Sequence, residues 1–266
     1  MVKGRVIFSL LSILFCLSSC RGQSNSQNST NDISNISNLE IPQLVQDRPE
    51  QILYRKGYTA SYNQNTKNAN WVAWHLTSEH TDGPNKRKGI SYMVDEEVVG
   101  GRQELVDWYN HGLDIDHGHL CPAGDNKWDR EAMAQTFLLS NMCPQNSNLN
   151  QGMWENLESR CRGWARQYGE IFIATGPIFY SDNYRTIGPN QVGVPDAFYK
   201  VILALNKKPK AIGFIMPNIT PEYSNLKPYV VTVDRIEEIT GIDFFYNLPD
   251  DIENVIEAEA DFDVWH

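Results

Sequence analysis

Four strand-like apolar runs separated by turns fill the second half of the chain and limit the folds that it can adopt. They read EIFIATGPIF, VGVPDAFYKVILAL, KAIGFIMPN and YVVTVDRIEEITGIDFF. The last run turns helical after Val233 and ends at Gly241, a residue type that commonly follows a helix. Strands and helices alternate here without a regular βαβ rhythm. We therefore expect an α+β fold with a mixed or antiparallel sheet core flanked by helices.

Helical patterns lie between these runs and the N-terminal half. One begins behind an Asp cap at Asp129, and a longer one covers about residues 148–166. Its apolar residues recur every three or four positions and predict a buried stripe: Trp154, Leu157, Cys161 and Trp164. Segment 58–76 begins and ends with strand-like pieces, and segment 85–95 is expected to lead into another strand.

The length and composition indicate one globular domain. The chain has 266 residues, of which 41% are hydrophobic, and no internal repeat or second linker interrupts it between about residues 50 and 248. We expect the folded domain to cover residues 46–249. No stretch reaches the roughly 20 apolar residues that cross a bilayer, which excludes a multi-span membrane protein.

The net charge of −10 argues only weakly against a nucleic-acid partner. Seven of the 33 acidic residues lie in residues 250–266, where no Lys or Arg balances them. We expect this segment to be an acidic C-terminal tail. The global charge therefore decides little about which surface meets a polyanion.

The N-terminus is typical of an export signal. Lys3 and Arg5 precede an apolar run of about a dozen residues, and the ending Leu-Ser-Ser-Cys resembles a bacterial lipobox. Residues 1–19 are therefore expected to be a lipoprotein-type signal peptide and Cys20 the lipidation site. The protein would then be anchored to a membrane, on the periplasmic side or at the cell surface. The alternative is an ordinary cleaved signal that releases a secreted protein.

Residues 20–45 are expected to form a flexible tether. Ser, Asn, Gln and Thr dominate its first part and aromatic residues are absent, so it buries too little surface to order itself. Beyond Cys20, three cysteines remain in the mature chain, Cys121, Cys143 and Cys161, so one disulfide at most forms inside a monomer.

Two histidines stand on one face of an expected extended segment. His117 and His119 in LDIDHGHLCPAGDN are two positions apart, and side chains alternate with period two along a strand. Two interpretations stay open at this point: two ordinary surface or core histidines, or a zinc site that also uses Cys121. No fourth zinc ligand is evident.

Further along, Asn150, Glu158 and Arg162 fall within about 120° of one another around a helix of 3.6 residues per turn. One side of this helix can therefore form a polar site while the apolar stripe packs on the core. The alternative is a solvated helix face.

These two segments together resemble the DNA/RNA non-specific endonuclease family of the ββα-metal type. The family pattern of Asp-Arg-Gly-His, then Ser-Asn-x-x-Pro-Gln, then Leu-Asn with Trp and Leu-Glu downstream is matched in order and spacing by three segments: 116–119 (DHGH), 140–145 (SNMCPQ) and 149–158 (LNQGMWENLE). The resemblance covers roughly residues 55 to 248 and implies the ββα-metal nuclease fold.

The resemblance also implies roles. His119 would be the general base that takes a proton from water, and Asn150 the single protein ligand of a Mg²⁺ ion. Glu158 would orient the water shell of the ion, Arg162 would brace the phosphate, and Asn141 would help to shape the site. Mn²⁺ is an expected substitute for Mg²⁺, and no small-molecule cofactor is expected. These roles match what phosphodiester hydrolysis requires.

The resemblance leaves open which residues of this chain contact the phosphate. The family commonly has Arg where this chain has His117, an imidazole that is only partly charged at neutral pH at its ordinary pKa near 6.5. A weaker grip on phosphate and a loss of activity toward alkaline pH follow from that charge. The upstream phosphate-binding Arg of the family corresponds to Arg87 or Lys88, and Arg102 is a further basic candidate.

Cys121 and Cys143 each follow a proposed site residue by two positions. We expect a disulfide between them that ties the two active segments together; the alternative is two small buried thiols.

The sequence thus predicts a metal-dependent endonuclease that cuts DNA and RNA with little sequence preference, and the family resemblance implies that it leaves 5′-phosphate ends. A membrane is an expected further partner through Cys20, and a homodimer is left open. Two rivals remain. One is a binding module of the same fold that has lost catalysis, and the other is a sequence-specific or inhibitor-regulated toxin nuclease.

Overall fold

A computed structural model describes residues 36–206 and 208–265 of the chain. Its strands are β1 (Gln51–Tyr54), β2 (Thr59–Asn63), β3 (Asn68–Thr77), β4 (Ile115–His119), β5 (Met142–Asn146), β6 (Glu170–Ile178), β7 (Arg185–Ile187), β8 (Val192–Val194), β9 (Ala197–Ala204), β10 (Lys210–Pro217) and β11 (Val230–Val231). Its α-helices are α1 (Arg130–Gln135), α2 (Glu155–Tyr168), α3 (Val233–Thr240) and α4 (Asp250–Glu257). A π-helical turn, Leu149–Trp154, leads into α2. Short 3₁₀ turns cover Glu79–Thr81, Leu105–Trp108, Ala123–Asp125, Leu139–Asn141, Lys227–Tyr229 and Phe262–Trp265.

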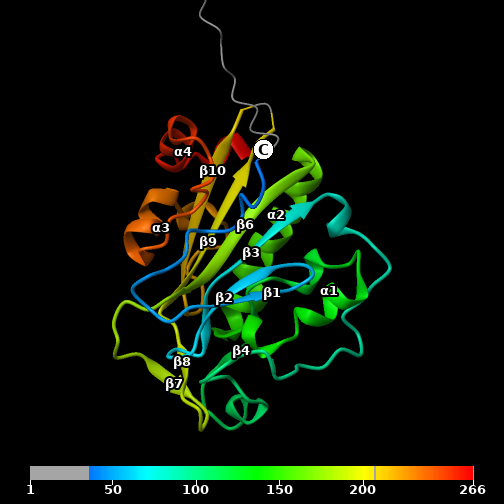
Figure 1. Ribbon diagram of the computed structural model, residues 1–266, viewed down its shortest axis with the longest axis vertical. Helices are drawn as coiled ribbons and strands as arrows, with labels where there is room; N and C mark the ends of the chain where they lie inside the picture. Colours follow the sequence, from blue (N-terminus) through cyan, green and yellow to red (C-terminus); the bar gives the residue numbers. More distant parts are fainter. Residues whose placement is uncertain (1–35, 207, 266) are drawn as a thin grey trace, which may run out of the picture. The chain divides into compact units, whose positions relative to one another are not determined.

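The main sheet of the described chain has seven strands in the order β1-β2-β3-β6-β9-β10-β11, and each neighbouring pair is antiparallel (Figure 1). Two small hairpin sheets, β4–β5 and β7–β8, stand beside it. The expected α+β class with an antiparallel sheet core is confirmed.

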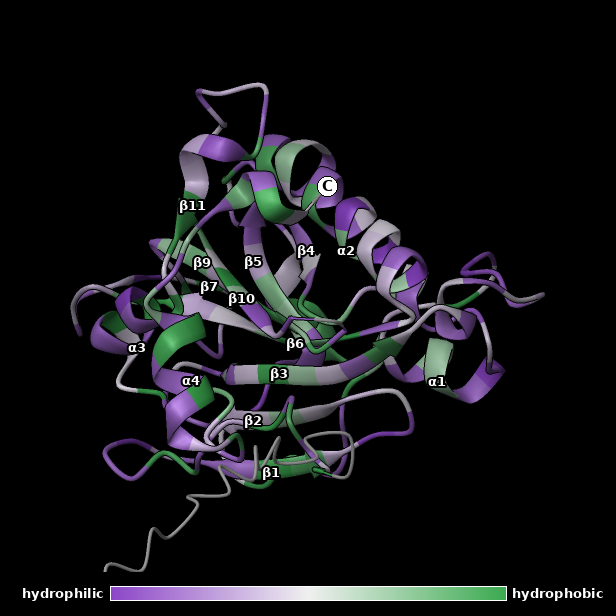
Figure 2. Cartoon of the chain, turned by 90° about the horizontal axis from the view of Figure 1, so that it is seen from above, coloured by the Kyte–Doolittle hydropathy of each residue, from purple (hydrophilic) through white to green (hydrophobic). Residues whose placement is uncertain are grey.

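Helices cover both faces of the main sheet (Figure 2). Because side chains alternate along a strand, Ile171 and Ile173 of β6 pack in the same core cluster as α2, whereas Phe172 and Ala174 pack in the cluster that includes residues of α3 and α4. This arrangement explains why β6 and β9 read as continuous apolar runs instead of alternating ones.

Most of the expected elements are present. Segment 58–76 forms β2 and β3, and the four predicted stripe residues of the long helix are at most 2% exposed. Helix α1 starts behind Asp129, whose carboxylate accepts hydrogen bonds from two backbone amides of the first turn. Helix α3 ends before Gly241, which has a left-handed φ of 66°.

Contrary to expectation, segment 85–95 does not lead directly into a strand. In this segment only Met93 makes a β-bridge, to Leu138, with hydrogen bonds to the backbone of Phe137 and Leu139. A single bridge does not build a ladder, so this segment is not a strand.

The expectation of a separate acidic tail at residues 250–266 is also wrong. Helix α4 buries Ile256 in the cluster of α3, and Trp265 is 1% exposed against Trp164 of α2. The indole Nε1 of Trp164 donates a 2.6 Å hydrogen bond to the carbonyl of Trp265. Apolar residues at helical spacing hold this segment on the domain in spite of its charge.

Residues 36–45, which were expected to belong to the tether, pack on the folded domain. Leu39 is 1% exposed in the cluster of α3 and α4, Ile36, Ile41 and Val45 pack against that cluster, and the Gln43 amide donates to the carbonyl of Asp243. The folded domain therefore begins before residue 46, because four apolar residues follow the polar stretch.

The signal peptide at 1–19 and the lipidation site Cys20 lie outside the described residues. Within the described chain, no helix combines the length and the apolar character needed to cross a bilayer.

Candidate active site

The β4–β5 hairpin and the helix that follows it build the site. Asp116 lies opposite Gln145 and His119 opposite Met142 in the antiparallel register, and the chain then enters the π-helical turn and α2. Gly118 is needed for the close approach of the two strands: a Cβ at this position would lie 2.6 Å from Cβ of Gln145. The result is a ββα unit with the histidines on one strand and Asn150 on the helical turn.

A cavity of about 560 Å³ lies at this unit. Six residues singled out in the sequence line it: Arg87, His117, His119, Asn150, Glu158 and Arg162. The predicted polar side of the helix therefore faces the same cavity as the two histidines. The π-helical turn widens the helix at Asn150, a distortion often found at functional sites.

His119 is held by aromatic contacts and keeps one ring nitrogen free. Its ring packs edge-on against Phe137 at 4.9 Å and tilts against Tyr92 at 6.1 Å. Nε2 is buried and has no hydrogen-bond partner among the described residues. Burial, helped by the positive charge of Arg87, lowers the pKa of His119 to about 3, so the imidazole is neutral at physiological pH. A neutral imidazole can accept a proton.

Asp116 orients the amide of Asn150, a contact that the sequence reasoning missed. Nδ2 of Asn150 donates a 2.8 Å hydrogen bond to Oδ2 of Asp116, which also accepts from Gln151, while Oδ1 accepts from Ser147. Burial raises the pKa of Asp116, but these three hydrogen bonds outweigh it and hold the pKa below its ordinary value. Because the amide nitrogen is occupied, the amide oxygen of Asn150 is left to bind a ligand; it accepts no hydrogen bond from the described residues.

Glu158 and Arg162 line the cavity, and Arg162 pairs with the buried Asp125. Arg162 donates from Nη1 to Asp125 at 2.9 Å and from Nη2 to Ser159 at 3.0 Å, and lies 4.0 Å from the Glu158 carboxylate. Burial raises the pKa of Glu158 to about 7. The ion pair with Asp125 fixes the guanidinium, so its remaining N–H groups point at a defined place.

A second buried cation supports this wall. Lys200 of β9 is 1% exposed, and its ammonium lies 5.0 Å from the ring centre of Trp74 and 4.6 Å from that of Trp154. Its charge lowers the pKa of Glu158 and so offsets part of the effect of burial. The signal in the sequence was a lone Lys inside the apolar run VPDAFYKVILAL.

His117 is sandwiched between two aromatic rings, which corrects its predicted charge. Its imidazole stacks on Tyr92 at 4.1 Å and on Trp108 at 4.0 Å. Burial lowers the pKa of His117 to about 4, so it carries no charge at neutral pH. The zinc interpretation also fails, because His117, His119 and Cys121 form no metal-ligating group in the part of the chain that the structure describes.

We therefore expect the effect of having His instead of Arg at position 117 to be independent of pH in the neutral range. We expect the ratio of the cleavage rate of His117→Arg to that of the wild type to change less than about twofold between pH 6 and pH 9, because a group with a pKa near 4 changes charge only at lower pH. Rates on plasmid DNA across this range measure the ratio. A ratio that rises steadily toward pH 9 would show that the wild-type imidazole titrates there.

The three basic residues predicted to contact phosphate fall into two groups. Arg87 lines the cavity, with its guanidinium carbon 5.6 Å from the ring centre of Phe137. Lys88 is exposed and is not among the lining residues. Arg102 also lies outside the lining and pairs with Glu96 and Glu104, which neutralise it. Of the three candidates, the structure brings only Arg87 to the histidines.

Asn141 is a positioning residue and does not face the cavity. It is fully buried, its Oδ1 accepts from the Cys121 amide, and its Nδ2 donates to the carbonyls of Cys121 and Thr136. These bonds tie the end of β4 to the turn before β5. All its polar side-chain atoms bond to backbone groups, an arrangement that suits the expected role of shaping the site.

The disulfide expected between Cys121 and Cys143 is absent. Both residues are buried free thiols, as is Cys161. Cys143 lies opposite Gly118 in the hairpin, whereas Cys121 follows the end of the ladder and contacts the amide of Asn126. Burial raises the pKa of both thiols well above the ordinary value, so the thiol form is stable.

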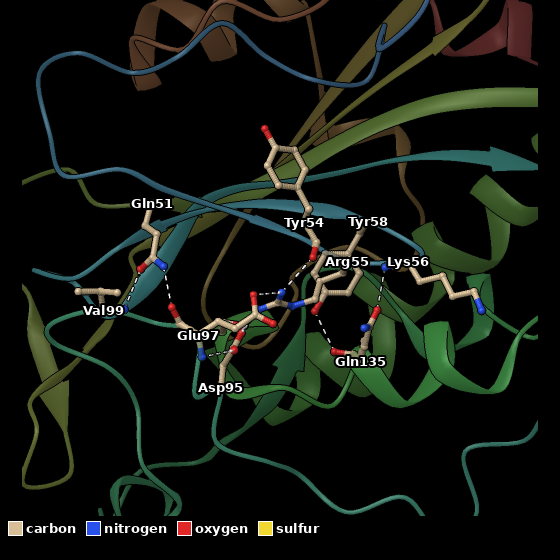
Figure 3. A network of polar contacts seen from close by, with 10 residues as sticks. Gln51, Tyr54, Arg55, Lys56, Tyr58, Asp95, Glu97, Val99 and Gln135 are labelled. Carbon is tan, nitrogen blue, oxygen red and sulfur yellow. Dashed lines mark hydrogen bonds and ion pairs between the residues drawn. The ribbon is translucent and has the colours of Figure 1, made fainter.

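A buried ion pair supports the hairpin from behind. Figure 3 shows Arg55, from the turn after β1, pointing at Asp95, with Nη2 at 2.7 Å from the carboxylate. Ser140 donates to the same carboxylate. Through its bond from Ser140, the Asp95 carboxylate joins the segment that carries Tyr92 to the turn before β5. This role for Asp95 was not foreseen from the sequence.

The donors at the cavity fit a hard divalent cation. The free amide oxygen of Asn150 and the carboxylate of Glu158 are oxygen donors, and no thiolate lines the cavity. Mg²⁺ prefers oxygen ligands and keeps several of its waters, so one amide oxygen in an open cavity suits it.

The comparisons agree with this geometry. The family model for the DNA/RNA non-specific endonucleases matches residues 35–251. The chain is 32% identical over 210 residues to the mitochondrial endonuclease G of Homo sapiens, covering 74% of this chain and 70% of that one. It is 33% identical over 220 residues to the mitochondrial nuclease of Saccharomyces cerevisiae, covering 73% and 65%.

In structure, the chain matches a chain of the crystal structure of the EndoG/EndoGI complex with a TM-score of 0.73 and 26% identity, over 83% of this chain and 94% of that chain. This similarity and the β4–β5–α2 unit confirm the ββα-metal fold. The chain therefore belongs to the DNA/RNA non-specific endonuclease family of metal-dependent nucleases.

Proposed function

We propose that the protein is a Mg²⁺-dependent endonuclease that hydrolyses DNA and RNA without sequence preference and leaves 5′-phosphate ends. The observation that carries this proposal is the unpartnered, buried Nε2 of His119 in a cavity that also receives Asn150, Glu158 and Arg162. An orphaned ring nitrogen at a cavity is the arrangement that a general base needs before its water arrives.

Each residue has one task in this proposal. His119 removes the proton from the attacking water through Nε2. Asn150 and Asp116 place one amide oxygen as the ligand of Mg²⁺, with Mn²⁺ as a substitute. Glu158 accepts hydrogen bonds from cavity waters, and Arg162, fixed by Asp125, donates to the phosphate. When bound, the ion supplies positive charge that stabilises the charge developing on the phosphate and on the leaving 3′ oxygen.

The lack of sequence preference follows from the same contacts. Arg87 and Arg162 are donors suited to phosphate oxygens, and contacts to phosphate carry no base information. We therefore expect both DNA and RNA to be cut. The test is cleavage of plasmid DNA and of a single-stranded RNA, followed by end labelling. Product 5′ ends that accept a phosphate label only after phosphatase treatment support the proposal, and ends that accept it directly contradict it.

The raised pKa of Glu158 predicts an acidic limb in the pH profile, that is, a fall of the cleavage rate toward low pH when Mg²⁺ is subsaturating. With a pKa of about 7, Glu158 loses its negative charge as the pH falls from 8 to 6, and the cavity then attracts a cation less strongly. At subsaturating Mg²⁺ we expect the cleavage rate to drop about tenfold over this range. Added Mg²⁺ shifts the limb to lower pH, because cation and proton compete.

Glu158→Gln removes this limb, and Glu155→Gln, at another acidic residue of the cavity wall, keeps it. An unchanged limb in Glu158→Gln would assign the titration to another group.

Anchoring to a membrane through Cys20 remains a proposal from the sequence alone. It predicts that the full-length chain, expressed in a bacterium with a labelled fatty acid, takes up the label and that Cys20→Ser does not. A labelled Cys20→Ser variant would contradict it. A homodimer likewise stays a prediction.

A further inference from the structure

Helices α3 and α4 carry a second group of acidic side chains, on the sheet face opposite α2. Figures 1 and 2 both show the two helices side by side. Asp234 and Glu237 of α3 and Glu257 of α4 each place a carboxylate oxygen so that all three lie within 4.8 Å of one another. None of the three lines the cavity of the active site.

A buried oxygen without a partner marks this group as more than a charged surface. Glu257 is 4% exposed, and its Oε1 is buried with no hydrogen-bond partner in the described chain. A buried polar atom left unpaired is costly, whereas a bound ion would satisfy it. Oε1 of Glu237 is fixed by a 2.7 Å hydrogen bond from the Phe244 amide, which leaves its second oxygen for a ligand.

The surroundings add negative charge and supply no counterion. Asp243 and Glu253 are close enough for their charges to raise the pKa of Glu257. Among the ion pairs of the described residues, none involves these two residues or the three cluster carboxylates.

We propose that Asp234, Glu237 and Glu257 form a calcium site that joins α3 to α4. Three carboxylates without His or Cys are the donors of a hard cation. Ca²⁺ takes six to eight oxygen ligands in a flexible geometry, whereas Mg²⁺ is usually held by one or two carboxylates and keeps several of its waters. Three carboxylates that lie within 4.8 Å of one another therefore suit calcium better than magnesium. Asp234 is exposed, which leaves room for waters to complete the coordination.

The site would clamp the C-terminal segment on the domain. Glu257 is the last residue of α4, and its ion would link this helix to α3 in addition to the packing of Ile256. A ligand that binds the folded chain and not the unfolded one raises the melting temperature. The ion is distinct from the one proposed at Asn150, so the absence of a calcium site would leave the proposed nuclease function unchanged.

The test is thermal unfolding of the whole protein with EDTA, with millimolar CaCl₂ and with the same concentration of MgCl₂. We expect Ca²⁺ to raise the Tm of the wild type by at least about 2–4 °C. The shift disappears in Glu257→Gln, which keeps the shape of a protonated Glu, and in Asp234→Asn, whose exposed position protects folding. Asp251→Asn, an exposed acid of the same helix α4, keeps the shift, and so does Asn150→Ala, which removes the other expected ion.

Three results would overturn the proposal. They are no Ca²⁺-dependent shift in the wild type, the same shift in Asp234→Asn and Glu257→Gln as in the wild type, and a shift that Asn150→Ala abolishes. An equal shift with Mg²⁺ would overturn the assignment to calcium.

Discussion

Replacing His119 by alanine is expected to lower kcat on plasmid DNA by about 10²- to 10⁴-fold, the contribution that a positioned general base makes. The reason is structural: of the three histidines that line the cavity, His117 is stacked on both faces, His111 accepts from the Leu113 amide, and His119 alone keeps a buried ring nitrogen without a partner among the described residues. The loss should appear mainly in kcat, because proton removal belongs to the chemical step.

The matched control is His75→Ala. His75 lies on β3, pairs with Glu170 and stacks on Phe172, outside the cavity lining, so its loss is expected to leave kcat within about twofold. Melting curves of both variants show whether the fold survives. A folded His119→Ala variant that keeps more than a tenth of the wild-type kcat would remove His119 from the role of base.

The second large effect is expected for Asn150→Ala. Because the hydrogen bond to Asp116 leaves the amide oxygen of Asn150 free at the cavity, the loss of Asn150 should cut the cleavage rate at 1 mM Mg²⁺ by about 100-fold, an effect worth nearly 3 kcal/mol. Higher Mg²⁺ should restore part of the rate, since the remaining donors bind the ion more weakly. The measurement is a Mg²⁺ titration of initial rates.

Asn148→Ala serves as the control for that titration. Asn148 is exposed just before the same helical turn and bonds to Thr220, so its change should leave the Mg²⁺ dependence as in the wild type. If Asn150→Ala shows the wild-type Mg²⁺ dependence, another residue holds the ion.

Local periodicity predicted the framework of the site. Period two placed His117 and His119 on one face of a strand, and both contact Tyr92 in the structure. The helical period placed Asn150, Glu158 and Arg162 on the side of the helix that faces the cavity, with the apolar stripe on the core. These features depend on neighbours in the chain, so the sequence carries them directly.

Features that depend on distant residues were missed or predicted wrongly. The sandwich of His117 needs Tyr92 and Trp108 to meet from two loops, and Lys200 needs two Trp residues from β3 and the π-helical turn. The cysteine prediction failed for the same reason, because spacing along the chain does not give the register of β4 on β5.

The amino-acid composition led to wrong predictions of where the folded domain begins and ends. The acidic residues of 250–266 suggested a solvated tail, but Ile256 and Trp265 bury the segment against the sheet and α2. Leu39 does the same at the other end. A few apolar side chains decide burial, and an average over the segment hides them.

We propose that the neutral imidazole of His119 acts beside a divalent ion held at Asn150. Nicking of supercoiled plasmid tests this, with the purified wild type and His119→Ala each assayed after treatment with EDTA and after Mg²⁺ is restored. We expect rapid nicking only by the wild type and only with Mg²⁺. Nicking by the wild type in EDTA, or nicking by His119→Ala at the wild-type rate, would contradict it.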